Sequence, residues 1–315
     1  MATTINADNG VSSGSAGLKQ SADNSGSLVL QTNGTSALTI DTSQVVTFAN
    51  PPTSGIQSGY LNRGLNGTNN SGTPNTQYDF SADLVVLINS NGAPIRRTNT
   101  GTITNNVSTA GPAANGRDQS GAFSSSSWIH FYFIWNGTTL ATVSSATAPP
   151  TGPTLPSGYT HWAYIGAVRF NASSQLVRTR IRGSQVSVDS TNDCVALNGS
   201  NFQLSYASLS LSSFIPPNAV TFGMTIYEGN SSPLSTNDCI VRIGVDGSNA
   251  FAWTGYTGIR ADAATGLFVG DSIQGIPNVS QTIYYLIGSP QGLTGVESTS
   301  VSFYVNRYDI PNGGE

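Results

Sequence analysis

The chain has 315 residues, and its formal net charge of −4 with a single lysine, Lys19, does not favour nucleic acid as a partner. Only 9% of the residues are charged and 37% are apolar, against averages of about 25% and about 45–50% for globular proteins. The low hydrophobicity is not combined with a high net charge, so the composition is not that of a disordered chain.

The first 26 residues are polar and rich in Gly and Ser, and we expect them to become ordered only against another surface. They contain neither the basic region nor the apolar core of a secretory signal. No stretch of the sequence approaches the roughly 18 apolar residues of a membrane-spanning helix. We therefore expect a protein that is made in a cytoplasm and does not insert into a membrane.

Residues 27–48, SLVLQTNGTSALTIDTSQVVTF, predict three short strands. Asn33-Gly34 is a strong hairpin signal, and DTSQ at 41–44 supplies the second turn. The apolar residues of each strand are two positions apart and therefore share a face: Leu28 and Leu30, Leu38 and Ile40, Val46 and Phe48. The next segment, ANPPTSG at 49–55, contains two consecutive prolines, which cannot lie in a central strand and therefore mark a boundary.

This short segment cannot bury enough apolar surface alone, because chains below about 40 residues usually fold only with an external aid such as oligomerisation. Three copies around one axis would give the six apolar residues a shared core and would cover the strand edges. A coiled coil could do the same, but the sequence has no heptad repeat. We therefore interpret residues 1–55 as an oligomerisation and attachment segment, with these six residues as its contacts.

Residues 56–188 contain a second group of strand signals. Residues 84–88 predict a buried strand that ends at the Asn91-Gly92 turn. The strongest signal in the chain is SSSSWIHFYFIWNGTTLATVSS at 124–145, which predicts a β-hairpin. We expect one further strand at 161–171 and another at 176–188.

Residues 189–315 contain eight more short apolar segments, at the spacing of about 8–12 residues that is typical of a β-sandwich. Helical periodicity is almost absent from the chain. The expected fold is all-β: an N-terminal β-meander, an antiparallel, jelly-roll-like sandwich over 56–188, and over 189–315 either a second sandwich or the second half of the same one.

Residues suited to catalysis or metal binding are scarce. His130 lies in an apolar strand and His161 precedes Trp162, and because no metal-ligand spacing is present we interpret both as hydrogen-bonded strand residues. Only three glutamates occur and most aspartates stand in turns, so no carboxylate pair for glycoside hydrolysis is evident. We expect no enzymatic activity, no cofactor and no metal.

The pentapeptide STNDC occurs at 190–194 and again at 235–239, each time before an apolar strand. One interpretation is a duplication that pairs Cys194 with Cys239, or that forms a cation site from Asp193 and Asp238. The interpretation we favour is two polar turns, each followed by a small buried cysteine.

Three arginines, Arg178, Arg180 and Arg182, alternate with other residues and should share one face of a strand. A solvated strand face, or a ladder with acidic partners, is the favoured interpretation over an anion site.

Residues 21–48, SADNSGSLVLQTNGTSALTIDTSQVVTF, resemble a segment near the N-terminus of many virion proteins of tailed bacteriophages, mostly tail fibres or other appendages. The shared features are an L-x-L strand, a Thr-Asn-Gly-Thr turn, and ALTIDTSQ followed by V-x-F. Four further stretches are similar to such proteins: YDFSADLVVLINSNG, the hairpin WIHFYFIWNGTTLA, LPSGYTHWAYIGAVRFN and FIPPNAV. The resemblance implies a location in the virion, an all-β fold and a homotrimer, and it carries no catalytic residues.

Three functions follow from this resemblance. The first is a trimeric tail-fibre or spike appendage, anchored by its N-terminus to tail, collar or capsid proteins, that binds a host glycan or outer-membrane protein. The second is a capsid decoration or head-fibre protein, and the third is a polysaccharide-degrading tailspike enzyme. Candidate sugar-stacking residues are aromatics in expected loops, for which core packing or trimer contacts are the competing interpretation: Tyr159, Trp253 and Tyr256.

Overall fold

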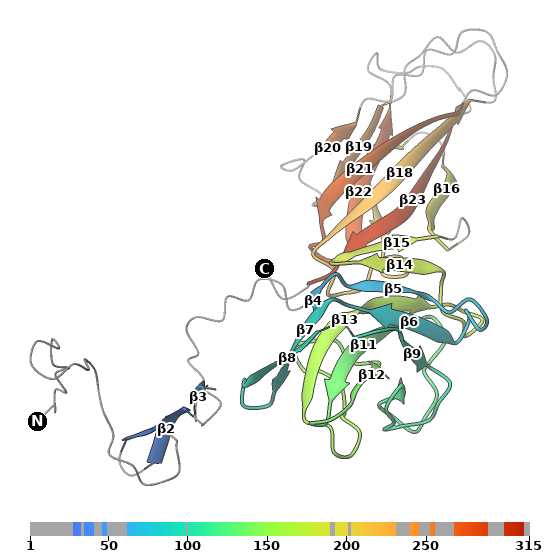
Figure 1. Ribbon diagram of the computed structural model, residues 1–315. Coiled ribbons are helices and arrows are strands. Elements are labelled where there is room, and N and C mark those ends of the chain that lie inside the picture. Colours follow the sequence, from blue (N-terminus) through green and yellow to red (C-terminus); the bar gives the residue numbers. More distant parts are fainter. Residues whose placement is uncertain are drawn as a thin grey trace, which may run out of the picture. The chain divides into compact units, whose positions relative to one another are not determined.

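The computed structural model describes residues 28–32, 35–40, 46–48, 62–98, 100–189, 193–200, 203–230, 240–245, 253–255, 268–288 and 299–311. The chain divides into two compact units, Met1–Gln57 and Ser58–Glu315, which we describe separately. All regular structure within the described residues is β-strand, which confirms the predicted all-β fold (Figure 1).

The first unit contains an antiparallel sheet with the strand order β1-β2-β3. Its strands are β1 (Leu28–Thr32), β2 (Thr35–Ile40) and β3 (Val46–Phe48). The predicted three-stranded meander is therefore present, with the Asn33-Gly34 pair between its first two strands.

The second unit begins with a seven-stranded sheet in the order β10-β12-β11-β13-β7-β4, with β8 paired to β7. All of its pairs are antiparallel except β10 with β12. The strands are β4 (Asn62–Arg63), β7 (Leu84–Asn89), β8 (Pro94–Thr98), β10 (Gly116–Arg117), β11 (Ser127–Trp135), β12 (Leu140–Ser145) and β13 (His161–Phe170).

A nine-stranded sheet runs through the whole second unit in the order β21-β18-β23-β15-β14-β5-β6-β9, with β16 also paired to β23. Its strands are β5 (Asn66–Asn69), β6 (Gln77–Ser81), β9 (Ile103–Asn106), β14 (Thr179–Arg182), β15 (Gln185–Val188), β16 (Val195–Ser200), β18 (Thr221–Asn230), β21 (Phe268–Pro277) and β23 (Thr299–Asp309). A four-stranded sheet completes the unit in the order β17-β22-β19-β20: β17 (Gln203–Ser210), β22 (Thr282–Gly288), β19 (Ile240–Gly244) and β20 (Trp253–Gly255).

The first sandwich core lies between the seven-stranded sheet and the part of the nine-stranded sheet around β6. Tyr78 and Phe80 of β6 meet Phe131 of β11, with ring centroids 5.6 and 5.0 Å apart respectively. All three side chains are fully buried. Because alternate residues of a strand point to opposite faces, such a cluster needs aromatic residues at every second position, as β6 and β11 supply.

A second core lies between the other end of the nine-stranded sheet and the four-stranded sheet. Tyr285 of β22 packs edge-on against Phe303 of β23, with ring centroids 5.4 Å apart. The two cores share one sheet, because β15 pairs with β23. The expected boundary near residue 188 therefore lies inside a continuous sheet rather than in a linker between two separate sandwiches (Figure 1).

The prediction of one strand over 176–188 is wrong. The segment forms two antiparallel strands, β14 and β15, which turn at Gly183 and Ser184. Gly183 has a φ of 60°, a left-handed conformation that glycine adopts without the steric penalty of a side chain. The turn brings the valines of β15 back beside β14 and so adds one strand to the sheet.

Truncating Phe131 to alanine should lower the free energy of unfolding by about 3–5 kcal/mol, because the ring is fully buried within the aromatic cluster. Equilibrium urea denaturation measures the change. The matched control is Val279→Ala, because Val279 is 69% exposed and its truncation should cost less than about 0.5 kcal/mol. Equal losses in the two variants would contradict the placement of this core.

Candidate functional site

The strand register of the N-terminal sheet brings the six predicted contact positions together. Leu28 pairs with Ile40 and Ile40 with Val46, and a parallel row consists of Leu30, Leu38 and Phe48. Positions that are opposite each other across strands, or two apart along a strand, lie on the same face of a sheet. All six apolar positions therefore lie on one face, which we call the apolar face.

The opposite face of this sheet has a different composition. Its central row consists of Val29, Thr39 and Thr47. Val29 is 37% exposed, and Thr39 on this face is half-buried, as are Leu38 and Ile40 on the apolar face. A three-stranded sheet with one apolar face becomes stable when that face packs against a further layer.

The structure describes two of the three candidate stacking residues, and they lie beside different sheets. Tyr159 lies in the loop before β13 and packs against the core, and its partial burial raises the pKa of its hydroxyl. Trp253 begins β20, where it pairs with Ile243 of β19. Tyr256 lies outside the described residues.

His130 is a buried, hydrogen-bonded strand residue, as predicted. Its Nδ1 lies 3.1 Å from the hydroxyl of Tyr164, and the side-chain amide of Asn218 donates to that same hydroxyl at 2.9 Å. The Tyr164 hydroxyl therefore links His130 to Asn218 within the buried interior. Burial lowers the pKa of His130 to about 4, which favours the neutral imidazole. His161 stands at the start of β13 beside the hydroxyl of Thr160.

Only one copy of the repeated pentapeptide can be compared with the predictions. Cys194 is buried just before β16, and burial raises the pKa of its thiol. Cys239 and Asp238 lie outside the described residues. Within the described ranges, no group of three or more His, Cys, Asp or Glu side chains could hold a metal ion.

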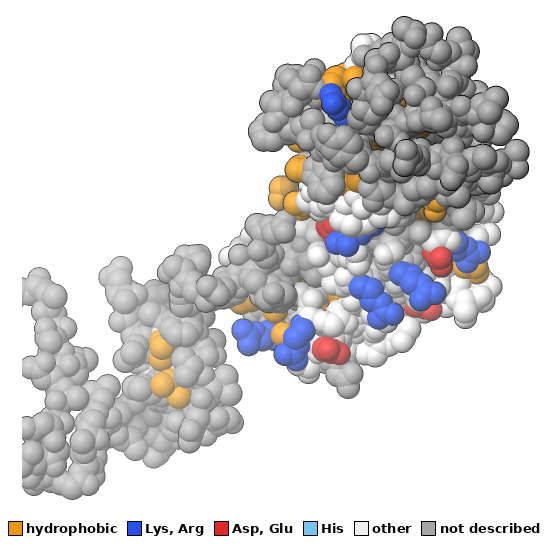
Figure 2. Space-filling view, turned by 90° about the horizontal axis from the view of Figure 1, so that it is seen from above, with side chains coloured by type: hydrophobic (Ala, Val, Ile, Leu, Met, Phe, Trp, Pro, Cys, Tyr) orange, Lys and Arg blue, Asp and Glu red, His pale blue; other side chains and the backbone are white. Residues whose placement is uncertain are grey.

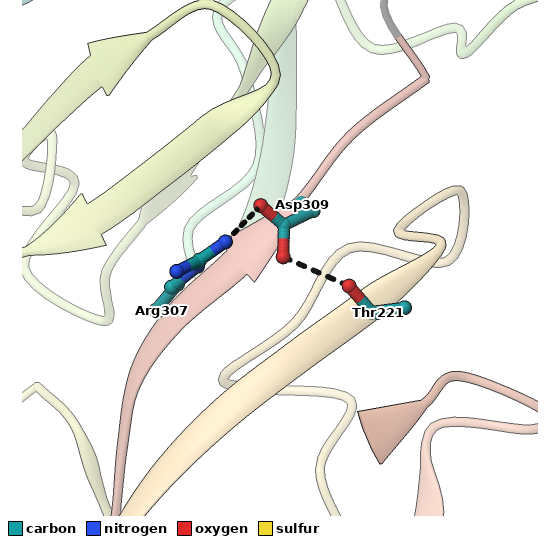
Figure 3. Close-up of polar contacts among 3 residues, drawn as sticks. All are labelled: Thr221, Arg307 and Asp309. Atoms are coloured by element: carbon teal, nitrogen blue, oxygen red, sulfur yellow. Dashed lines mark hydrogen bonds and ion pairs between the residues drawn. The ribbon is translucent and has the colours of Figure 1, made fainter. Parts of the chain in front are cut away.

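Two aspartates of the nine-stranded sheet are engaged in local hydrogen bonds. Asp79 accepts from the hydroxyl of Thr104 at 2.6 Å. Asp309 accepts from Thr221 at 2.8 Å and forms an ion pair with Arg307 at 2.9 Å (Figure 3). In the part of the chain that the structure describes, this is the one ion pair between side chains. These carboxylates hold neighbouring strands and loops together.

The three arginines that the sequence placed on one strand face do lie on one face. Arg178, Arg180 and Arg182 are exposed, whereas Thr179 and Ile181 between them are buried. We call these three residues the arginine row. The row follows β14, near the middle of the nine-stranded sheet.

The neighbours of the arginine row are polar and come from two adjacent strands. On β5, Thr68 lies opposite Arg180 and Asn66 opposite Arg182. On β15, Ser187 and Gln185 occupy the corresponding positions. Sequence reasoning missed the β5 side of this surface because NGTN has no apolar alternation, and only its pairing with β14 makes it a strand.

Neither a protein-family model nor a curated protein matches this sequence. Among the described residues, no helix is long and apolar enough to cross a membrane.

Stability should decrease on acidification through His130. The pKa of this group is about 4 when folded and about 6.5 when unfolded, so its contribution is complete above pH 6.5 and is lost as the pH falls towards 4. The loss at pH 4 should reach about 3 kcal/mol, measured by urea denaturation across this range. His130→Gln should flatten the profile, whereas His161→Gln should keep most of the slope. An unchanged slope in His130→Gln would contradict the assignment.

Proposed function

We propose that this protein is a structural component of a tailed-bacteriophage particle, a trimeric fibre or spike-type appendage. In this proposal the N-terminal sheet assembles the trimer and anchors it to other virion proteins, and the β-sandwich unit is displayed to the host surface. The observation that carries the proposal is the apolar face of the N-terminal sheet, where all six apolar positions fall in two adjacent rows.

Association of three copies is the simplest way to cover this face. Each chain supplies one three-stranded sheet, and three such faces around an axis enclose a common apolar core. The sheet has too few strands to fold back on itself, and apolar burial is the main favourable term in association. The sequence resemblance of residues 21–48 to segments of phage appendages supports the same arrangement.

The larger unit suits display to the outside. Its fold is a layered β-structure, and only 9% of the residues of the chain are charged. On the face shown in Figure 2, basic and acidic side chains stand among many uncharged polar ones. Such a surface can bind polar ligands without an apolar patch that would cause aggregation.

Leu38→Asp should dissociate the assembly. A carboxylate on the apolar face would lose its hydration in a shared core, at a cost of several kcal/mol in each chain. We expect light scattering to give three times the 32.7 kDa chain mass for the unaltered protein and the mass of one chain for the variant. The matched control is Thr39→Asp on the opposite face, which should remain a trimer. A monomeric unaltered protein would refute the proposal.

Deletion of residues 1–50 should abolish incorporation into particles while the rest of the chain remains soluble. The physical reason is that the deletion removes the apolar face but leaves both sandwich cores intact. Quantitative mass spectrometry of purified particles measures incorporation and copy number. A few trimers per particle would indicate a tail or collar appendage, and many would indicate a capsid decoration or head fibre. Absence of the full-length chain from particles would refute a structural role.

A further inference from the structure

The arginine row concentrates positive charge in a chain that has little of it. Three of the 12 basic residues lie within the five positions 178–182, in β14 and directly before it. Arg180 and Arg182 form no ion pair and no side-chain hydrogen bond with any described residue. Arg178 has one long contact, 3.4 Å to the side-chain oxygen of Asn75. Side chains two apart on a strand are about 7 Å apart, so the three guanidinium groups repel one another in the free protein.

The other charges on this face do not neutralise the arginine row. Arg307, two strands from β14, is already held by Asp309 (Figure 3). The side-chain amide of Gln185 also lies within hydrogen-bonding distance of this guanidinium. Asp79 lies opposite Thr68 on the other side of β5, where it accepts hydrogen bonds from Asn70 and Thr104, and β5 separates it from Arg180. The row is therefore a strip of positive charge in which no arginine forms an ion pair with a described carboxylate, and it has polar groups on both sides.

We propose that the arginine row, with Asn66 and Thr68 on one side and Gln185 and Ser187 on the other, binds an acidic polysaccharide. A guanidinium group forms paired hydrogen bonds with a carboxylate or phosphate, and it remains charged at all physiological pH values. The flanking hydroxyl and amide groups match the hydroxyl groups that separate the charges of such a polymer. The inference rests on the proposed function as a surface appendage and gives that appendage a ligand class.

Other macromolecules fit this surface less well. The core of a protein–protein interface is apolar and rich in aromatic residues, whereas the positions beside the row are Asn66, Thr68, Gln185 and Ser187. Nucleic-acid binding draws on many closely spaced phosphate contacts, whereas the arginine row supplies only three cations. A carbohydrate with widely spaced negative charges can be bound by three arginines. Its hydroxyl groups can form hydrogen bonds with the polar side chains beside the row.

Binding of three soluble polymers to the purified full-length protein tests the proposal. Polygalacturonate supplies carboxylates, poly(glycerol phosphate) supplies phosphates, and dextran is the neutral control. We expect affinity for at least one anionic polymer and none for dextran, with a loss of about tenfold or more when salt rises from about 0.05 to 0.3 M. The better of the two anionic polymers identifies the charged group. Binding to neither, or equal binding to dextran, would overturn the proposal.

The matched variants separate the arginine row from net charge. Arg180→Gln with Arg182→Gln should weaken binding about tenfold or more, whereas Arg63→Gln with Arg242→Gln, at exposed positions on other strands, should leave it within about twofold. Equal losses would overturn the proposal, as would a change of oligomeric mass in the first variant. Unchanged thermal unfolding shows that the variants fold, because all four side chains are exposed. Incorporation into particles tests the structural role independently and should be normal in both.

Discussion

The pairing of β15 with β23 is the contact on which the larger unit depends. It joins strands that are more than 100 residues apart in the sequence and makes one sheet serve two cores. Tyr308 of β23 stands at this junction, fully buried, and its hydroxyl donates to the carbonyl oxygen of Ala167 in the seven-stranded sheet at 2.8 Å. Trp128 packs edge-on against the same ring, with centroids 5.6 Å apart. The junction therefore ties the nine-stranded sheet to the seven-stranded sheet, at the place where one sheet serves both cores.

Successive side chains along a strand point to opposite faces of the sheet, and this alternation determines which residues each of the two candidate surfaces presents. On β14 it turns Ile181 into the core and leaves Arg180 and Arg182 outside. In the N-terminal sheet the same alternation collects the apolar positions on one face and the threonines on the other. One surface offers charge and hydroxyl groups, and the other offers an apolar layer. Their chemistry fits different tasks, recognition of a polar ligand and assembly of the protein.

Much of the fold could be predicted from the sequence because its hairpins are local. The β11–β12 hairpin has an Asn-Gly turn between two strands of apolar residues, and its whole signal lies within about 20 residues. For β7 the sequence predicted the strand and the Asn91-Gly92 turn, but not the polar strand β8 that follows. The sequences of short strands such as β4 and β10 contain no strand pattern. These residues form strands only because they pair with β7 and β12, which lie further along the chain. The arginine row could be predicted as a face from its spacing. Its neighbours on β5 could not, because register across distant strands is a property of tertiary structure.

The shared sheet also determines where this protein could be cut or joined. A break near residue 188 would divide a hydrogen-bonded ladder, because β15 would lose β23 and the aromatic residues at the junction would lose their cover. The division between residues 57 and 58 is different, since each side is a compact unit with its own sheets. In genetic terms, we expect that the N-terminal unit can be exchanged between proteins as a module, whereas residues 58–315 can be transferred only as one piece.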